Sequence, residues 1–474
     1  MIVTLADGSK VECEDQPFAE GGEGFLFWDK AGTHVIKLYR PEVIQNIAEY
    51  QRREAALQRI IGPEYSVVLG EPYWDELFAW PKAIIEQPAL GLTMLRAPKG
   101  TMELRWFLGS KQRQVVAGKH GPDKLGKWTN NLSLAIKMAR VVRRMHYRGL
   151  CHSDLSFRNF LVDPQQNQVV LIDCDGLVVP GFLPPNVLGT PMCMAPELMA
   201  QITSPGKKVD PSSQTDLHAL STLIYWLLFR RHPLIGPKVH HPDPGLDEAL
   251  GLGERALFIE HPTDKSNHIR DLPVPYTSML TPAVQELVEN AFILGLHNPA
   301  RRLSAADWER FLVRMTDSIV PCQNTRCPLG TFVLQPQRLA RCPACNTPLR
   351  SLPYVPILNF YRPRRGRKGH FQNDRDYTMV GWHGRTLHVW HADAAQAPGP
   401  GVDHNPKAML EFDRRQSKWY LRNADMPDMC LLDGVSGHQD VSPGKRVELT
   451  HGARLLLGSP HQCRLVYVQM LKLK

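Results

Sequence analysis

Apolar and polar positions follow different periods along the first 316 residues. Within the first 90 residues, the β-branched run Val35–Tyr39 predicts a strand, and Pro41–Ile60, which is rich in helix formers, predicts a helix. Farther along, apolar residues recur at helical spacing in Leu132–Tyr147 and Thr215–Phe229, which predicts two long helices. We therefore expect a small β-rich lobe followed by a larger helical lobe.

The pattern changes after residue 316. The segment from residue 320 to residue 348 is short, carries cysteines and is punctuated by prolines. The basic stretch Arg362–Lys368 has the composition of a linker, and from Tyr377 onward short apolar runs alternate with turn residues. We expect a small all-β sandwich there. Its predicted strands include Trp419–Asn423, Met429–Leu432, Arg446–Leu449 and Arg454–Leu457.

Composition narrows the class of protein. A chain of 474 residues suggests about three domains, and 43% hydrophobic residues argue against wholesale disorder. The net charge of +9 permits contact with phosphates but does not indicate a nucleic-acid binder. The apolar run His218–Phe229 is too short to span a bilayer, and the first residues show no signal peptide. We expect a cytoplasmic protein that makes no use of a membrane.

A glycine cluster and a lysine form the first chemical motif. Gly21, Gly22 and Gly24 would let backbone N–H groups approach phosphate oxygens, although a plain hairpin turn fits them too. Lys37 follows on the predicted strand and could hold phosphates, and Glu54 on the predicted helix could pair with it. Taken singly, Lys37 and Glu54 would each be a solvated surface residue.

The most informative segment lies between residues 152 and 176. His152–Asn159 places Asp154 and Asn159 five residues apart, and the apolar strand before Asp173 delivers two further carboxylates. Phosphoryl transfer requires one carboxylate to orient a hydroxyl and hard oxygen ligands for Mg²⁺. In this order, behind a glycine-rich turn and a lysine, the group favours chemistry over isolated surface roles.

Residues from about 15 to 315 resemble a Hanks-type, eukaryotic-like protein kinase domain. Beyond the motifs above, Ala195-Pro196-Glu197, Asp216 and Arg302 match the family, with Arg302 expected to pair with Glu197. The resemblance implies an α+β bilobal protein-kinase fold that uses ATP and Mg²⁺. It implies Asp154 as the base, Lys37 on the phosphates and Asn159 and Asp173 as Mg²⁺ ligands. The implied nucleotide-binding residues are Gly21, Gly22, Gly24, Leu26, Lys37, Glu54, the gatekeeper Met94, the hinge from Leu95 to Ala97, Asn159 and Asp173.

The sequence departs from the family pattern at several positions. Ser153 replaces the usual Arg before the base, and the segment from 173 to 197 holds a single hydroxyl residue, Thr190. We therefore expect a non-RD kinase that is not switched by activation-loop phosphorylation. Arg158 is expected to supply the charge that a lysine at Ser156 would otherwise provide, unless it is a surface residue. Asp175 could assist the metal or cap the turn, and we favour the cap.

Three functions are compatible with these motifs. A Ser/Thr protein kinase is favoured because Ala195-Pro196-Glu197 and Asp216 belong to a platform for protein substrates. The Asp173-x-Asp175 pattern also occurs in small-molecule phosphotransferases of the aminoglycoside-kinase type. An ATP-binding pseudokinase is disfavoured because Lys37, Asp154 and both metal ligands are present. The preference for Ser/Thr over Tyr follows family frequency, because Arg158 is typical of tyrosine kinases.

Four cysteines predict a metal site. Cys322 and Cys327, then Cys342 and Cys345, form a C-x4-C…C-x2-C pattern, which suits tetrahedral Zn²⁺. Four protein ligands leave no open position, so the zinc would be structural. Because the segment is too short to bury a core, we expect the metal to supply its folding energy.

The C-terminal sandwich weakly resembles a forkhead-associated domain without a recognisable phosphothreonine site. The predicted domains are kinase 1–316 (lobes 1–96 and 97–316), zinc ribbon 317–352, basic linker 353–372 and sandwich 373–474. The whole arrangement resembles bacterial kinases of tellurite-resistance-associated phosphorylation triads. That resemblance implies protein substrates, with a von Willebrand A-domain protein and a PP2C-type phosphatase as partners.

Overall fold

The computed structural model describes residues 1–474 except 63–71, 179–188, 204–208, 271, 273, 368, 400, 434–436, 460–462 and 474. The chain divides into two compact units, Met1–Ile269 with Asn290–Ala306, and Arg270–Glu289 with Asp307–Lys474. This division cuts across the boundary predicted at residue 316. Helices α10 (Tyr276–Met279) and α11 (Pro282–Glu289) group with the C-terminal unit, where Gln335 donates to the Leu280 carbonyl at 2.6 Å.

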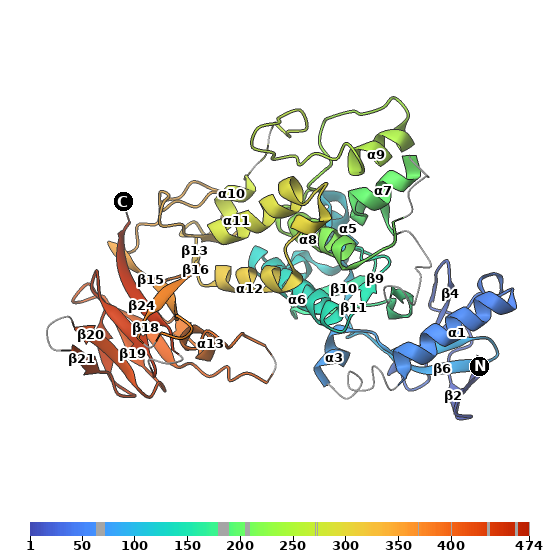
Figure 1. The fold of residues 1–474 in the computed structure, drawn as a ribbon, viewed down its shortest axis with the longest axis horizontal. Coiled ribbons are helices and arrows are strands. Elements are labelled where there is room, and N and C mark those ends of the chain that lie inside the picture. Colours follow the sequence, from blue (N-terminus) through green and yellow to red (C-terminus); the bar gives the residue numbers. More distant parts are fainter. Residues whose placement is uncertain are drawn as a thin grey trace. The chain divides into compact units, whose positions relative to one another are not determined.

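The first unit begins with a seven-stranded antiparallel sheet in the order β2-β1-β6-β7-β5-β4-β3 (Figure 1). The predicted strand at Val35–Tyr39 is confirmed as β5. The helix predicted over Pro41–Ile60 is confirmed as α1 only from Ile47 onward, and α1 packs on β6. Helix α1 begins after Asn46, whose side chain accepts from the Glu49 N–H at 2.7 Å. The elements are β1 Ile2–Leu5, β2 Lys10–Glu12, β3 Ala19–Glu20, β4 Gly24–Trp28, β5 His34–Tyr39, η1 Pro41–Val43, α1 Ile47–Ile61, β6 Pro81–Gln87 and β7 Gly91–Leu95.

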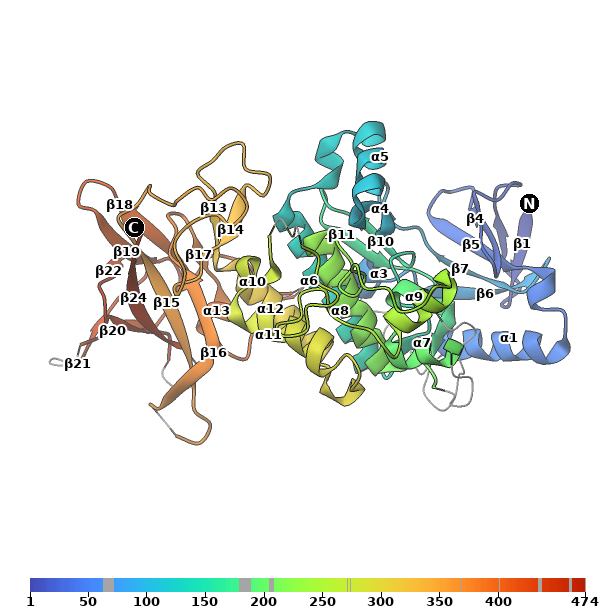
Figure 2. The ribbon, with the colours of Figure 1, turned by 90° about the horizontal axis from the view of Figure 1, so that it is seen from above.

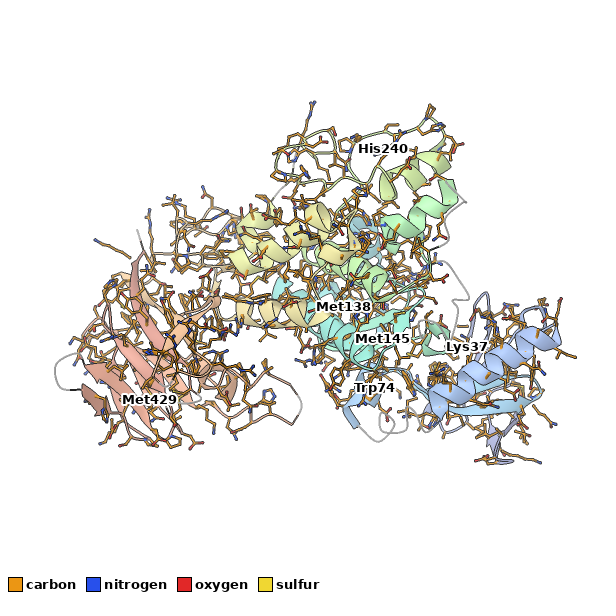
Figure 3. All side chains as sticks on the ribbon, in the orientation of Figure 1. Lys37, Trp74, Met138, Met145, His240 and Met429 are labelled. Carbon is orange, nitrogen blue, oxygen red and sulfur yellow. The ribbon has the colours of Figure 1, made fainter. Side chains whose placement is uncertain are left out.

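The helical part of this unit is built around α6 (Trp128–Tyr147) and α8 (Ser213–Phe229), which pack together. Helix α8 starts in a capping box between Ser212 and Thr215 and is apolar on nearly every side, so it is buried. Met138 and Met145 of α6 are fully buried in this core (Figure 3). Among the described residues, none of the helices is both long and apolar enough to cross a bilayer.

Short strands between these helices position the motifs that the sequence predicts to be catalytic. They form a sheet β11-β10-β8 and a pair β12-β9. The strands are β8 Met102–Glu103, β9 Cys151–His152, β10 Phe160–Asp163, β11 Gln168–Leu171 and β12 Leu177–Val178. The other helices and turns are α3 Pro72–Leu77, α4 Arg105–Leu108, α5 Ser110–His120, η2 Pro122–Leu125, η3 Cys174–Gly176, η4 Pro191–Cys193, α7 Pro196–Thr203, α9 Pro244–Leu252, η5 Asn290–Leu294 and η6 Pro299–Arg301.

The second unit ends in two antiparallel sheets, as predicted, in the orders β16-β15-β24-β23-β20-β21 and β17-β18-β19-β22 (Figure 2). The range 353–372, predicted as a linker, instead holds β15 and the start of β16, because β15 pairs with both β16 and β24. The elements are α12 Ala305–Thr316, β13 Ile319–Pro321, β14 Thr331–Val333, β15 Tyr354–Pro363, β16 Phe371–Val380, β17 Thr386–Leu387, α13 Val389–Ala392, β18 Ala408–Asp413, β19 Lys418–Asn423, β20 Met429–Asp433, β21 Gly437–Asp440, β22 Arg446–Glu448, β23 Arg454–Leu457 and β24 Leu465–Lys472.

One hydrophobic core joins the cysteine segment to these sheets. Phe332 and Leu334 of the β13–β14 hairpin belong to the same buried cluster as Val355 of β15 and Trp419 of β19. The expectation that metal alone provides the folding energy of the cysteine segment is therefore corrected. Apolar burial on the sandwich contributes as well.

Candidate functional site

The turn between β3 and β4 carries the predicted phosphate-binding glycines. The Gly21 N–H donates to the Gly24 carbonyl at 2.9 Å and closes the turn. A Cβ on Gly24 would lie 2.5 Å from the Leu38 carbonyl oxygen of β5, so close strand packing requires this glycine. A Cβ on Gly22 would meet no heavy atom of the described residues within 4 Å, so the backbone there is accessible to a ligand.

Lys37 of β5 is buried among three carboxylates. Its Nζ lies 2.7 Å from Asp175 Oδ2, 2.8 Å from Asp173 Oδ1 and 3.7 Å from Glu23 Oε2. Burial alone would lower the pKa of Lys37, but Asp173 and Asp175 outweigh it and raise that pKa well above its usual value. The ammonium group is therefore charged at neutral pH and lies against Asp173.

The expected partner of Lys37 is not the observed one. Among the ion pairs of the described residues, none joins Lys37 to Glu54. Helix α1 instead buries Arg53, which contacts Glu23 at 3.1 Å and Glu49 at 2.9 Å. Glu54, the next residue of the helix, is half-buried.

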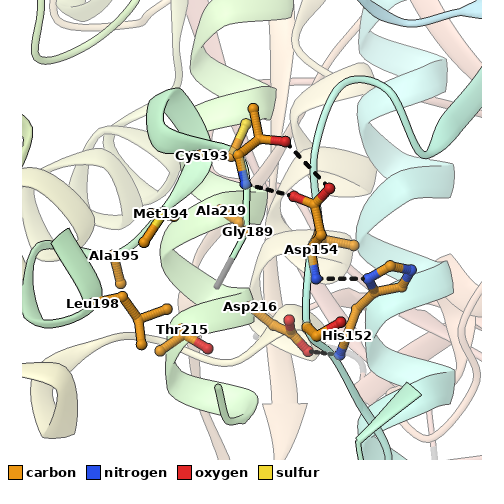
Figure 4. Close-up of a pocket in the computed structure, with 13 residues that line it drawn as sticks. His152, Asp154, Gly189, Cys193, Met194, Ala195, Leu198, Thr215, Asp216 and Ala219 are labelled. Atoms are coloured by element: carbon orange, nitrogen blue, oxygen red, sulfur yellow. Dashed lines mark hydrogen bonds between the residues drawn. The ribbon is translucent and has the colours of Figure 1, made fainter. Parts of the chain in front are cut away.

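Asp154, the predicted base, lies in the loop after β9 beside the end of the activation segment. Its carboxylate accepts hydrogen bonds from the Thr190 N–H at 2.8 Å and the Thr190 hydroxyl at 3.2 Å (Figure 4). These residues line a cavity of about 20 Å³ together with Gly189 and Cys193. Burial raises the pKa of the Cys193 thiol to about 12, so this cysteine stays protonated. The Thr190 hydroxyl shows that an alcohol oxygen can lie within hydrogen-bond distance of Asp154.

A buried network fixes the backbone of the loop that contains Asp154. Asp216 of α8 accepts from the His152 N–H at 3.0 Å and contacts the His146 ring at 2.9 Å. The His152 ring in turn accepts from the Asp154 N–H at 3.1 Å. Burial raises the pKa of Asp216, and its two partners oppose that shift. The loop is therefore positioned from the core of the unit rather than from solvent.

Asn159 and Asp173 are brought to the same place by adjacent strands. The Asn159 amide donates to the Asp154 carbonyl at 2.8 Å, and the Ile172 N–H donates to the Asn159 carbonyl at 2.8 Å. Asp173 has φ +61°, an uncommon conformation for a non-glycine residue. Its side chain remains 41% exposed, so the carboxylate is accessible from solvent. The Lys37 charge lowers the pKa of Asp173 and keeps it ionised.

The predicted gatekeeper and hinge residues border an apolar cluster. Met94 of β7 is buried in it, and the partly buried Leu26 and Ala97 pack against it. Leu161 of β10 and Ile172 join the same cluster from the helical part of the unit. The sequence analysis did not single out these last two, although each lies within two positions of a predicted metal ligand along the chain.

Two further predictions concern the activation segment and its surroundings. Arg302 donates to both carboxylate oxygens of Glu197, at 2.7 and 2.8 Å, which confirms the expected pair. Arg158 is exposed, and its backbone N–H donates to the buried Ser156 hydroxyl at 3.3 Å. Residues 179–188, on which the activation-segment prediction also depends, lie outside the described residues.

The second unit contains the four-cysteine cluster. The sulfur atoms of Cys322, Cys327, Cys342 and Cys345 all lie within 4.8 Å of one another. Cys322 and Cys345 are 3.5 Å apart, and Cys327 and Cys342 are 3.6 Å apart. Zn–S bonds of about 2.3 Å in a tetrahedron give sulfur separations of about 3.8 Å. The four sulfur atoms and the distances between them therefore fit a metal ion bound by four thiolates.

Comparison with known proteins places a kinase-like sequence in the first unit. Residues 128–176 match the lipopolysaccharide kinase (Kdo/WaaP) family. A dual serine/threonine and tyrosine protein kinase of Apis mellifera is 27% identical over 105 residues, and the human protein of that name is 29% identical over 96 residues. These matches cover 22% and 20% of this chain but only 10% and 9% of the relatives. The chain thus carries a protein-kinase-like domain.

Proposed function

We propose that this chain is an ATP- and Mg²⁺-dependent protein kinase that phosphorylates Ser/Thr hydroxyls of protein substrates. One observation carries the proposal. A continuous path of short contacts runs from Lys37 to Asp173, through Ile172 to Asn159, and from Asn159 to Asp154. A lysine, two metal-ligand candidates and a base thus meet in one place, which is the set that phosphoryl transfer requires.

In the proposed step, the acceptor oxygen bonds to the γ-phosphorus while the bond to the ADP oxygen breaks. Asp154 orients the acceptor hydroxyl and takes its proton. Asn159 and Asp173 would hold Mg²⁺, which offsets the charge of the phosphates when it is bound. Lys37 would contact the phosphates as a fixed positive charge, and exposed Arg158 would approach the transferring group. Positioning and electrostatics account for nearly all of the rate gain in such chemistry.

The nucleotide base has a matching apolar surface. Leu26, Ala97, Leu161 and Ile172 are partly buried and pack on one cluster that includes Met94. Covering their remaining exposed area with a flat aromatic base would remove apolar surface from water. Leu26 of β4 lies directly opposite Lys37 of β5 in the sheet, which supports adenine binding next to the phosphate site.

The proposal is tested by phosphate transfer from labelled ATP to a Ser-rich protein substrate, followed by phosphoamino-acid analysis. Asp154→Asn is expected to lower kcat by about a thousandfold or more, because the loss removes the base. Asp123→Asn, an exposed carboxylate on η2, is the matched control and should retain full activity. Equal activity of Asp154→Asn and wild type would contradict the assignment.

A second candidate is a small-molecule phosphotransferase. The match of residues 128–176 to the lipopolysaccharide kinase family favours it, because that segment contains the catalytic loop. In this case the acceptor hydroxyl next to Asp154 would belong to a saccharide instead of a serine or threonine of a protein substrate. The same assay with phosphate-accepting lipopolysaccharide separates the two: label in the saccharide and none in protein would select this candidate.

We further propose that the four cysteines hold a structural Zn²⁺. Purified protein should contain about one zinc per chain, and Cys327→Ser should lose it, whereas Cys430→Ala outside the cluster should keep it.

The von Willebrand A-domain protein and the PP2C-type phosphatase stay predicted partners. Phosphate appearing on the first of these in a mixture with ATP would support the prediction, and its absence would argue against it.

A further inference from the structure

The carboxylate cluster around Lys37 is already occupied by a cation. Glu23, Asp173 and Asp175 present oxygens within 4.8 Å of one another, as a metal site would. The Lys37 ammonium lies among them, 2.7 to 3.7 Å from each. In this structure the three carboxylates therefore surround the Lys37 ammonium group rather than a metal ion.

The two aspartates of the cluster differ in exposure. The Asp173 side chain is 41% exposed, whereas the Asp175 side chain is 2% exposed. Oδ2 of Asp175 accepts two hydrogen bonds, from Lys37 Nζ at 2.7 Å and from the Tyr39 hydroxyl at 2.8 Å. A buried carboxylate is costly unless it is paired, and these two donors supply the pairing. Asp173 can therefore turn to a metal, while Asp175 is committed to Lys37.

Helix α1 contributes a cation to this cluster rather than an acid. Arg53 reaches Glu23 at 3.1 Å and stacks over the Tyr39 ring at 4.9 Å. Glu23 in turn lies 3.7 Å from Lys37. The helix thus acts on the lysine only through a second residue, while Asp175 in the turn after β11 touches it directly.

We propose that Asp175, supported by Tyr39, is the positioning residue that holds Lys37 where it would bind phosphate. Glu54, the partner expected from the sequence, does not hold the lysine. This inference rests on the proposed phosphotransferase function. It has a physical consequence: when Mg²⁺ competes for Asp173, Asp175 remains as the direct anchor of the ammonium. Displacement of α1 would then leave Lys37 in place, so the site would not depend on that helix for assembly.

The first test measures the chemical reactivity of Lys37 in protein without nucleotide. Acetylation by acetic anhydride at pH 8, read by mass spectrometry, reports how readily the buried amine leaves its carboxylate partners and meets the reagent. Asp175→Asn should speed acetylation of Lys37 about tenfold or more, because the ammonium group loses its 2.7 Å contact with a carboxylate. Tyr39→Phe should change it in the same direction but less. Glu54→Gln should change it no more than Glu86→Gln, an exposed control on β6.

The second test compares steady-state kinetics of the same variants. Asp175→Asn should lower kcat about a hundredfold, since a misplaced group costs that order of rate, and at least ten times more than Glu54→Gln does. The Mg²⁺ concentration for half-maximal rate should stay within about threefold of wild type. If Asp175→Asn raised that concentration strongly and left Lys37 acetylation unchanged, Asp175 would be a metal ligand and the inference would be overturned.

The two tests separate this inference from the proposed function. Changed Lys37 acetylation in a chain that transfers no phosphate would uphold the anchor and reject the kinase assignment. If Asp175→Asn failed to fold, Tyr39→Phe would decide the matter, because it removes only the supporting hydroxyl. A larger effect of Glu54→Gln than of Tyr39→Phe on Lys37 acetylation would overturn the anchor.

Discussion

Removing the Glu197 carboxylate should destabilise the kinase-like unit strongly. The Arg302 side chain is 2% exposed, and both of its terminal nitrogens bond to Glu197, at 2.7 and 2.8 Å. Arg302 also donates to the carbonyls of Gln214 and Gly295, both at 2.9 Å, which hold it in place. In Glu197→Ala the guanidinium would therefore stay buried without a countercharge. Breaking such a pair costs about 3–5 kcal/mol.

The magnitude converts into a measurable shift. At about 2–4 °C per kcal/mol for a domain of this size, Glu197→Ala should lower Tm by about 10 °C in scanning calorimetry. The double variant Glu197→Ala/Arg302→Met should be less damaging than the sum of the single variants, because no unpaired charge remains. A loss below about 1 kcal/mol, with additive single variants, would refute the reasoning and place this pair among weak surface pairs.

Three further predictions concern pH, backbone and metal. Burial lowers the pKa of His232 to about 4, and its neutral ring donates to the Met192 carbonyl at 2.8 Å. The unfolded chain therefore binds more protons than the folded chain between pH 6.5 and 4. The contribution of His232 to the free energy of unfolding is fully present above pH 6.5, and it falls by up to about 3 kcal/mol as the pH drops toward 4. In urea unfolding, the free energy of unfolding of His232→Gln should depend less on pH than that of wild type, and an equal dependence would contradict this. Gly189 has φ +109°, and a Cβ there would lie 3.3 Å from the Ser153 carbonyl, so Gly189→Ala should lower both Tm and kcat, whereas Gly118→Ala, with open space at its Cβ, should not. Chelation of zinc should speed amide hydrogen exchange at the β13–β14 hairpin, while exchange in β19 and β24 stays slow. An equal loss of protection in all three places would contradict this and show that the metal stabilises both sheets.

Local pattern predicted the regular elements well. The apolar spacing of Thr215–Phe229 and the β-branched run Val35–Tyr39 each produced the expected element, α8 and β5. Both segments are long or strongly biased, so local preference and burial agree. The cysteine spacing likewise predicted a cluster that the structure assembles.

The sequence failed where the outcome depended on direction or on distant contacts. Helical spacing placed Glu54 on α1 but did not reveal that Arg53 is the buried residue of this helix that pairs with Glu23. The hydrogen bond between Tyr39 and Asp175 joins residues 136 positions apart, so no local sequence pattern predicts it. Basic charge suggested a linker at 353–372, although the apolar residues from Val355 to Phe360 already fitted a buried strand. Charge describes the exposed face of a segment and says little about its pairing.

The central claim is that Lys37, Asn159 and Asp173 form one site for the phosphates of a metal-bound nucleotide. Calorimetric titration with the β,γ-imido analogue of ATP tests it most directly, with and without Mg²⁺. The account predicts one binding event per chain that requires Mg²⁺ and is lost in Asp173→Asn. Absence of binding by the wild-type chain, or equal Mg²⁺-dependent binding by Asp173→Asn, would contradict it.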